Sequence, residues 1–186
     1  MAVARRYRGK TNELFTAVLL NIALFASDFA GQLGQRLRAL DPLAGGGTTL
    51  FTALRRGYDV AGIEREREDV ETTMAFTRQF LREQGVPFSF VDEHLRGRGR
   101  RGVFRVGRGD ARRMLALALG DSREAEDLLD DLPGGARFHV LAADLPYGVR
   151  HSGQVRDLLR EGLPAWESAL LPGAGVALAW DATRLS

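Results

Sequence analysis

The chain has 186 residues, of which 45% are hydrophobic and 27% are charged, and this suits one globular domain with its own core rather than two. It has no cysteine and three scattered histidines, which excludes disulfides, thiolate metal ligands and a cysteine nucleophile, so we expect no metal site. A formal net charge of +2 gives no general argument for nucleic-acid binding. No secretory signal is visible and the apolar run 17–26 is too short to span a bilayer, so we expect a cytoplasmic protein without a membrane partner.

A basic tail and a helix open the chain. The helix is predicted from Thr11, with apolar residues at helical spacing that are expected to form a buried face. These residues are Leu14, Phe15, Val18, Leu19, Ile22 and Phe25. Residues 1–34 are therefore expected to pack on a single domain formed by residues 35–186.

A glycine-rich turn at 41–50 is the centre of the sequence. An apolar run leads into it, a helical pattern leads out, and Gly45 to Gly47 lie between, where glycine allows positive φ and close approach of a ligand. Glu64 follows nineteen residues after Gly45, at the end of a second apolar run. That spacing is typical of a carboxylate that binds a ribose diol in nucleoside-binding α/β folds. The plainer reading is a simple loop followed by a solvated strand-end charge.

Strands and helices then alternate. Strands are predicted at 36–41, 60–64, 103–106, 138–142 and 175–180, and helices at 49–56, 68–83, 111–118 and 154–170. No element is predicted for 86–95. Near-continuous apolar strands between helices indicate a doubly wound, mainly parallel α/β sheet, whose ligands bind at the carboxyl ends of the strands. An acid falls at each predicted strand end: Asp41, Glu64, Asp110, Asp144 and Asp181.

Three stretches resemble motifs of S-adenosylmethionine-dependent amino-methyltransferases. They are Asp-Pro-Leu-Ala-Gly-Gly-Gly-Thr-Thr-Leu at 41–50, Gly-Tyr-Asp-Val-Ala-Gly-Ile-Glu at 57–64 and Asp-Leu-Pro-Tyr at 144–147. The closest resemblance is to the tRNA guanine-N2 methyltransferases that carry a THUMP domain, although no THUMP-like region is visible here. The resemblance implies a Rossmann-like class I methyltransferase domain. The C-terminal β-hairpin of that family is absent from this sequence, which would leave the last strand as an open edge.

The resemblance also implies site residues. The backbone of Gly45 to Gly47 would hold the methionine part of S-adenosylmethionine, Glu64 the ribose and Asp110 the adenine. The other implied cofactor contacts are Asp41, Ala44, Thr48, Arg65 and Ala111. Asp144 and the carbonyl of Leu145 would accept hydrogen bonds from a nucleobase amine, Pro146 would stiffen the turn, and Tyr147 would stack on the base.

The function implied is methyl transfer to an exocyclic amine, with guanine N2 in structured RNA such as tRNA as the first expectation. Adenine or cytosine in DNA is the alternative substrate, and a non-catalytic partner subunit or a nicotinamide-dependent oxidoreductase are alternative functions. A homodimer or a partner subunit would cover the open strand edge.

Arginines crowd the stretch 96–113. They are Arg96, Arg98, Arg100, Arg101, Arg105, Arg108, Arg112 and Arg113. This stretch suits phosphate contacts as well as it suits a solvated arginine-glycine loop.

Overall fold

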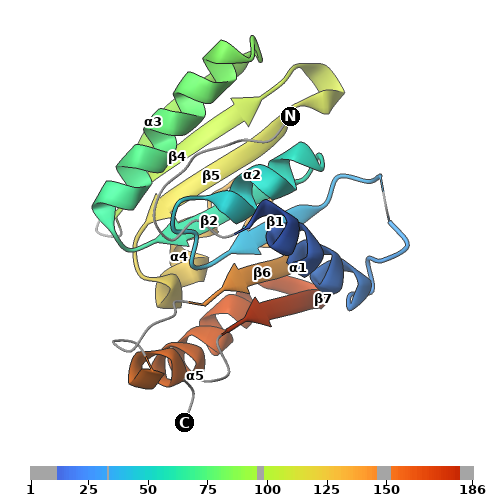
Figure 1. Cartoon of the computed structure of the whole chain (residues 1–186), viewed down its shortest axis with the longest axis vertical. Coiled ribbons are helices and arrows are strands. Elements are labelled where there is room, and N and C mark those ends of the chain that lie inside the picture. The colour runs from blue at the N-terminus through green and yellow to red at the C-terminus, as the bar shows by residue number, and fades with distance from the viewer. Residues whose placement is uncertain (1–11, 33, 96–98, 146–151, 181–186) are drawn as a thin grey trace.

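The computed structural model describes residues 12–32, 34–95, 99–145 and 152–180, with no side-chain description at 152–155. A seven-stranded sheet runs through it in the order β3-β4-β5-β2-β1-β6-β7 (Figure 1). The strands are β1 (Arg38–Asp41), β2 (Asp59–Glu64), β3 (Phe88–Leu95), β4 (Gly99–Val106), β5 (Arg113–Leu119), β6 (Phe138–Asp144) and β7 (Leu170–Ala179). The helices are α1 (Glu13–Phe25), α2 (Thr48–Arg55), α3 (Arg67–Glu83), α4 (Ala125–Leu129) and α5 (Ser152–Ser168), with short 3₁₀ turns at Gly109–Ala111 and Ser122–Glu124.

Helices cover both faces of the sheet. On one face α1, α2 and α3 pack against the strands, and on the other face α4 and α5 do so (Figure 1). Strands β5, β2, β1, β6 and β7 pair in parallel, so their carboxyl ends lie along one edge. The α/β class and the mainly parallel, doubly wound sheet are thus confirmed, while the division at residue 34 stays a prediction.

The predicted helix at 111–118 is wrong, because that segment is strand β5. Five consecutive residues, Met114 to Ala118, are buried between the two helical layers, and β5 pairs in parallel with β2 and antiparallel with β4. A short apolar run is compatible with a fully buried strand as well as with a buried helix, and in this protein it forms a buried strand. The predicted strand at 103–106 is the second half of β4, which forms an antiparallel hairpin with β3. An antiparallel hairpin therefore closes the β5 side of the sheet, in a place where the sequence indicated none.

The predicted buried face of the first helix is also wrong. Asn12 caps α1 by accepting hydrogen bonds from the amides of Leu14 and Phe15, so the helix begins as expected. Its buried side is a different one, formed by Thr16, Leu19, Leu20, Ala23 and Leu24. Five of the six predicted core residues are exposed instead, and Leu19 alone is buried.

None of the described helices combines the length and the apolar character needed to cross a bilayer.

Candidate active site at the carboxyl edge of the sheet

Three acids end three adjacent parallel strands. Asp41 is the last residue of β1, Glu64 of β2 and Asp144 of β6, and β1 lies between the other two strands. Glu64 and Asp144 each act electrostatically on Asp41. The sequence-based expectation that these carboxylates meet at one edge is therefore right for three of the five predicted acids.

The glycine-rich turn lies over this edge and is held by backbone hydrogen bonds. The amide of Leu43 donates to the Asp41 carboxylate at 3.0 Å, and the amide of Ala44 donates to the carbonyl of Ile63 at 2.9 Å. Gly47, with φ at 81°, ends the turn and opens α2, whose first residue, Thr48, is buried like Ala44. A larger residue at Gly47 would be strained by this positive φ, and its Cβ would clash with the methyl group of a threonine in α3. Glycine is therefore required here.

Asp41 is a buried carboxyl group with a strongly perturbed pKa. Its relative exposure is 2%, and burial raises its pKa from 3.8 to about 7. Hydrogen bonds from Thr49 and the Leu43 amide oppose that rise, and the negative charges of Glu64 and Asp144 add to it. Asp41 is therefore partly protonated near neutral pH.

Glu64 is half-buried and fixed by two backbone amides. One carboxylate oxygen accepts from the Gly45 amide at 2.8 Å and the other from the Glu66 amide at 2.7 Å. Both oxygens thus tie the glycine-rich turn to the loop after β2. Arg65, the next residue, is exposed and lies 3.5 Å from the Glu66 carboxylate. The observed role of Glu64 is to hold the turn in place, which the sequence did not indicate.

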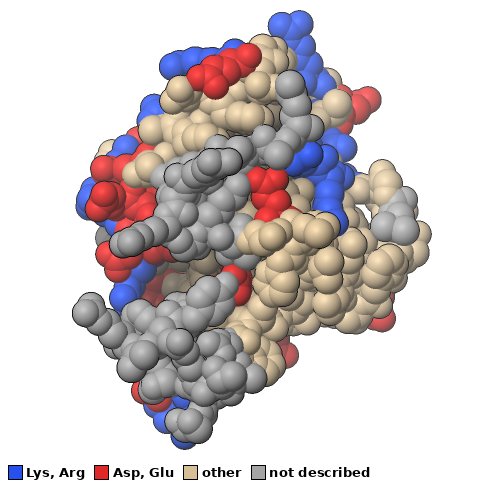
Figure 2. All heavy atoms as spheres, in the orientation of Figure 1, with Lys and Arg blue, Asp and Glu red and all other residues tan. Residues whose placement is uncertain are grey.

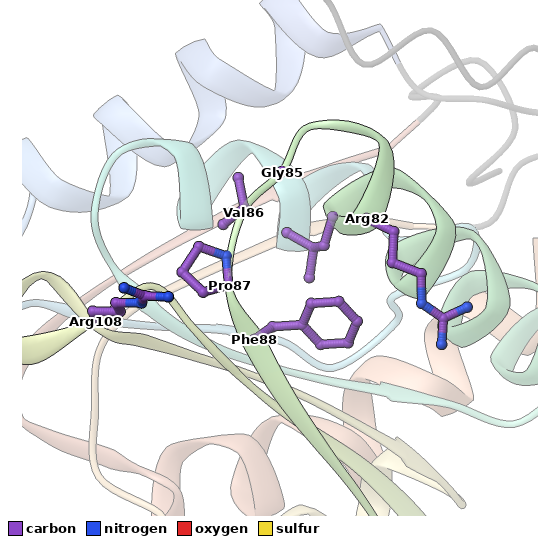
Figure 3. Close-up of a pocket in the computed structure, with 7 residues that line it drawn as sticks. Arg82, Gly85, Val86, Pro87, Phe88 and Arg108 are labelled. Atoms are coloured by element: carbon purple, nitrogen blue, oxygen red, sulfur yellow. The ribbon is translucent and has the colours of Figure 1, made fainter.

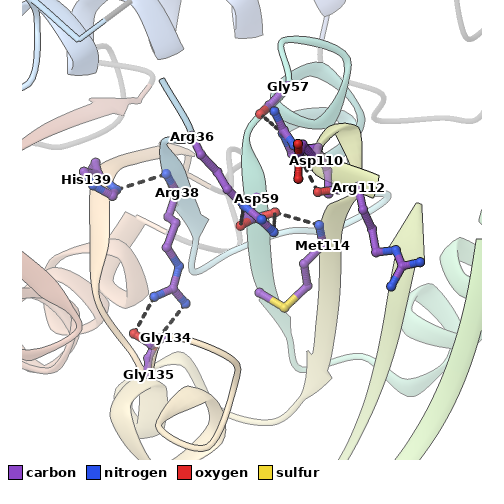
Figure 4. Close-up of polar contacts among 11 residues, drawn as sticks. Arg36, Arg38, Gly57, Asp59, Asp110, Arg112, Met114, Gly134, Gly135 and His139 are labelled. Atoms are coloured by element: carbon purple, nitrogen blue, oxygen red, sulfur yellow. Dashed lines mark hydrogen bonds and ion pairs between the residues drawn. The ribbon is translucent and has the colours of Figure 1, made fainter. Parts of the chain in front are cut away.

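Asp110 and Ala111 lie at the wrong end of the sheet for the predicted site. They precede β5, and β5 runs parallel to β2, so both residues lie at the amino edge, opposite Glu64. Figure 4 shows Asp110 among the groups of that amino edge, near Asp59, with Arg113 donating to its carbonyl at 2.7 Å. Both side chains are exposed there.

The acid at the carboxyl end of β5 is Asp121, which sequence reasoning missed. Gly120 donates its amide to the carbonyl of Glu64 at 3.0 Å, which brings the β5 end beside the β2 end. Asp121 follows directly and pairs with Arg123, whose hydrogen bond lowers the pKa of that carboxyl. The signal was present: an apolar run at 114–119 is followed after one glycine by an acid, much as the run at 58–63 is followed by Glu64.

The predicted catalytic turn is described only in its first half. Leu145 is buried and donates its amide to the carbonyl of Ala179 at 2.9 Å, which joins the ends of β6 and β7. Pro146, Tyr147 and Asp181 lie outside the described residues, so their predicted roles stay predictions.

A pocket of about 620 Å³ lies away from the acids. It is bounded by the end of α3, the start of β3 and Arg108, with Arg82 on its other side (Figure 3). Val86, Pro87 and Phe88 form its wall, and it belongs to the amino edge of the parallel strands. The acid cluster and this pocket thus lie at opposite ends of the sheet. We place the candidate site at the acids because three carboxylates end adjacent parallel strands there and burial raises the pKa of one of them, Asp41.

Much of the arginine stretch serves the fold. Arg101 is buried and pairs with Glu93 and Asp131, while Arg100 pairs with Asp92 and also with an acid of α3. Arg113 donates to the carbonyl of a glycine before β2. Arg105, Arg108 and Arg112 stay exposed, and Arg96 and Arg98 lie outside the described residues. Most of these described side chains therefore do not form a continuous phosphate-binding surface.

No protein-family model matches the chain, and a search of curated proteins finds no match either. Among solved structures, the chain is similar to the crystal structure of precorrin-8W decarboxylase from Methanobacterium thermoautotrophicum, with a TM-score of 0.52 and 20% sequence identity. The similarity covers 94% of this chain and 67% of that one. At this identity the similarity shows a shared fold.

This comparison corrects the predicted resemblance to tRNA guanine-N2 methyltransferases, which was wrong. The matching structure is named for a decarboxylation, and no family model or curated protein supports a methyltransferase. Three further predictions depended on this resemblance and are wrong as well: methyl transfer to RNA or DNA, a role in tRNA processing, and S-adenosylmethionine as cofactor. The geometry also separates two of the predicted cofactor contacts, because Asp110 lies at the amino edge and Glu64 at the carboxyl edge of the parallel strands. A glycine-rich turn with acids at strand ends is common to many α/β folds and does not specify one cofactor.

Within the described part of the chain, no cluster of histidines and acids has the arrangement of a metal site.

Proposed function

We propose that the chain is an enzyme whose active site is the acid cluster of Asp41, Glu64 and Asp144, and that it catalyses the decarboxylation of a small organic acid. The observation that carries the proposal is the convergence of three acids at the carboxyl ends of β1, β2 and β6. Burial raises the pKa of Asp41 to about 7, which supports a role in proton transfer at neutral pH. The reaction class is suggested by the decarboxylase that shares the fold. In open parallel sheets, ligands bind at the carboxyl ends of the strands, where this cluster lies.

The cluster supplies what a decarboxylation needs. The bond between the substrate carbon and its carboxylate breaks, carbon dioxide leaves, and the electron pair passes into a carbonyl group of the substrate adjacent to that carbon. A proton from the cluster then neutralises the resulting enolate, and water returns a proton to the cluster. General acid assistance of this kind contributes typically 10²–10⁴-fold in rate.

The site also constrains the charge of the substrate. Two acids beside Asp41 repel a carboxylate, which favours loss of that group as neutral carbon dioxide but penalises each further negative charge on the ligand. Arg65, Arg67 and Arg123 are exposed near this edge, and each already lies beside an acid: Arg65 beside Glu66, Arg67 beside Glu71, and Arg123 beside Asp121 and Glu161. The geometry therefore favours a substrate with one carboxylate and an adjacent carbonyl over a ligand with many carboxylates.

The test is a measurement of carbon dioxide release by the purified chain. Oxaloacetate, acetoacetate and a precorrin-type tetrapyrrole would be compared, with EDTA present to suppress metal-catalysed background. We expect release from an oxo acid, and a loss of about 10²-fold or more in Asp144→Asn. Glu167→Gln, an exposed acid at the end of α5, is the matched control and should keep full activity.

Two results would overturn the proposal. One is the absence of enzyme-dependent carbon dioxide release from all three probes. The other is an unchanged rate in Asp144→Asn, verified as folded by circular dichroism, because the acid cluster would then take no part in the reaction.

A further inference from the structure

Helix α1 is apolar on both of its sides. Its inner side, with Leu20, Ala23 and Leu24, is buried against the sheet. Its outer side carries a row of large apolar side chains that we call the α1 stripe. The α1 stripe consists of Leu14, Phe15, Val18, Ile22 and Phe25, with relative exposures of 74%, 43%, 46%, 53% and 64%. A helix that is apolar all round is normally buried on all sides, so the fold of one chain leaves this helix incompletely covered.

The α1 stripe is continuous. Leu14, Val18, Ile22 and Phe25 follow one another at intervals of four, four and three residues, which places them in one row along the helix. The row extends over about 17 Å of helix at 1.5 Å per residue. Figure 2 shows a broad uncharged field over α1, whereas charged residues gather over α3 and its surroundings. The row is therefore a surface of one chemical character rather than a scatter of single exposed residues.

The exposed area matches what a dimer needs. A fully exposed large apolar side chain offers about 180 Å², within the range for aromatic residues, so the α1 stripe exposes roughly 500 Å² in each copy. Two such surfaces together approach about 1,000 Å², the size at which a specific protein–protein interface begins. Flanking residues of α1 would add to this area.

The chain segments outside the described residues are a poor match for the stripe. Residues 1–11 contain Arg5, Arg6, Arg8 and Lys10 and so carry four positive charges against none negative. Residues 181–186 are six in number and contain one large apolar residue, Leu185. Another copy of the stripe matches it better, because it has the same apolar character, the same length and no charge of its own.

We propose that the α1 stripe is the interface through which two copies of this chain associate. A two-fold axis would cross α1 near Val18 and Ile22, so that the stripe of one copy packs on the stripe of the other, as an isologous interface requires. The ridges of the two helices would interdigitate as in other helix pairs. The α1 stripe contains none of the three acids, so this interface does not depend on the proposed enzymatic function.

The first experiment measures mass in solution by sedimentation equilibrium over a range of concentrations. The 20.4 kDa chain should sediment as a dimer, and Ile22→Lys should weaken the association by at least about a hundredfold, since it places two charges at the centre of the buried area. Leu163→Lys is the matched control, because Leu163 is 42% exposed but lies on α5, and it should dimerise like the natural chain.

A second experiment locates the contact. The chain has no cysteine, so Ile22→Cys and Leu163→Cys each introduce a single thiol. Mild oxidation at low concentration should link the Ile22→Cys chains covalently and leave the Leu163→Cys chains unlinked. Three results would overturn the proposal: a monomer at all concentrations up to about 100 μM, a dimer that Ile22→Lys leaves intact, or a monomer that binds phosphatidylcholine vesicles through the stripe.

Discussion

Replacing Asp41 with asparagine removes a buried carboxyl group while keeping its shape and its capacity to accept the Leu43 amide. In the natural chain the pKa of Asp41 is about 7, against an ordinary value of 3.8, because burial disfavours the charged form. That difference corresponds to about 4 kcal/mol at 1.36 kcal/mol per pKa unit.

The sign follows from proton binding in the two states. Below pH 3.8 the carboxyl group is protonated whether the chain is folded or unfolded, so burial of the charge costs nothing. Between pH 4 and 7 the unfolded chain has released the proton and the folded chain keeps it, so stability falls as pH rises. Above about pH 7 the folded chain carries the buried charge and the penalty is complete.

The assay is urea unfolding of the natural chain and of Asp41→Asn at several pH values from 4 to 9, at one fixed protein concentration. Groups elsewhere titrate alike in both chains and cancel in the difference. We expect the free energy of unfolding of Asp41→Asn relative to the natural chain to rise by about 1.4 kcal/mol per pH unit between pH 4 and 7 and then to level off. A difference that stays constant across this range would refute the reasoning, because Asp41 would then titrate equally in both states.

Three further changes test the packing around the site. Arg101→Met removes a buried guanidinium with two ion pairs, and we expect the free energy of unfolding to fall by about 2–3 kcal/mol in urea titrations, because both partner acids are partly exposed and can be hydrated again. Gly62→Ala places a methyl group 2.8 Å from two side-chain carbons under the glycine-rich turn and should cost about 1–3 kcal/mol, whereas Gly31→Ala, with open space around it, should cost much less. Glu64→Gln should weaken the hold on the Gly45 amide and speed hydrogen exchange there by at least about tenfold, while an unchanged exchange rate would show that the carboxylate does not fix the turn.

The first half of the fold could be predicted from the sequence because glycines mark its element ends. Gly57 ends α2 and Gly85 ends α3, each with positive φ, and the apolar runs between them have lengths typical of strands and helices. The β3–β4 hairpin could not be predicted in the same way. Only some of its side chains are buried, and Val91 interrupts the alternation between apolar and polar residues.

The candidate site was predicted in part for a related reason. The glycine-rich turn and Glu64 belong to elements that are neighbours in the sequence, and in the structure they lie side by side, as their spacing predicted. Asp110 was misplaced because the direction of β4 is a property of the whole sheet and cannot be seen in a local pattern. An acid after an apolar run lies at the carboxyl edge only where the strand is parallel to its neighbours.

The position of α1 sets an order of events for a chain that is still being synthesised. The inner face of α1 packs against β6 and β7, which lie more than a hundred residues later in the sequence. Strands β1 to β5, with α2 and α3, can pair among themselves as soon as they are made, because each finds a partner nearby in the chain. Helix α1 is thus made before the strands on which it packs, so its inner side cannot be fully buried until β6 and β7 have been made. The chain is therefore most prone to aggregate before β7 is complete, and a chaperone that recognises apolar helices would protect it at that stage.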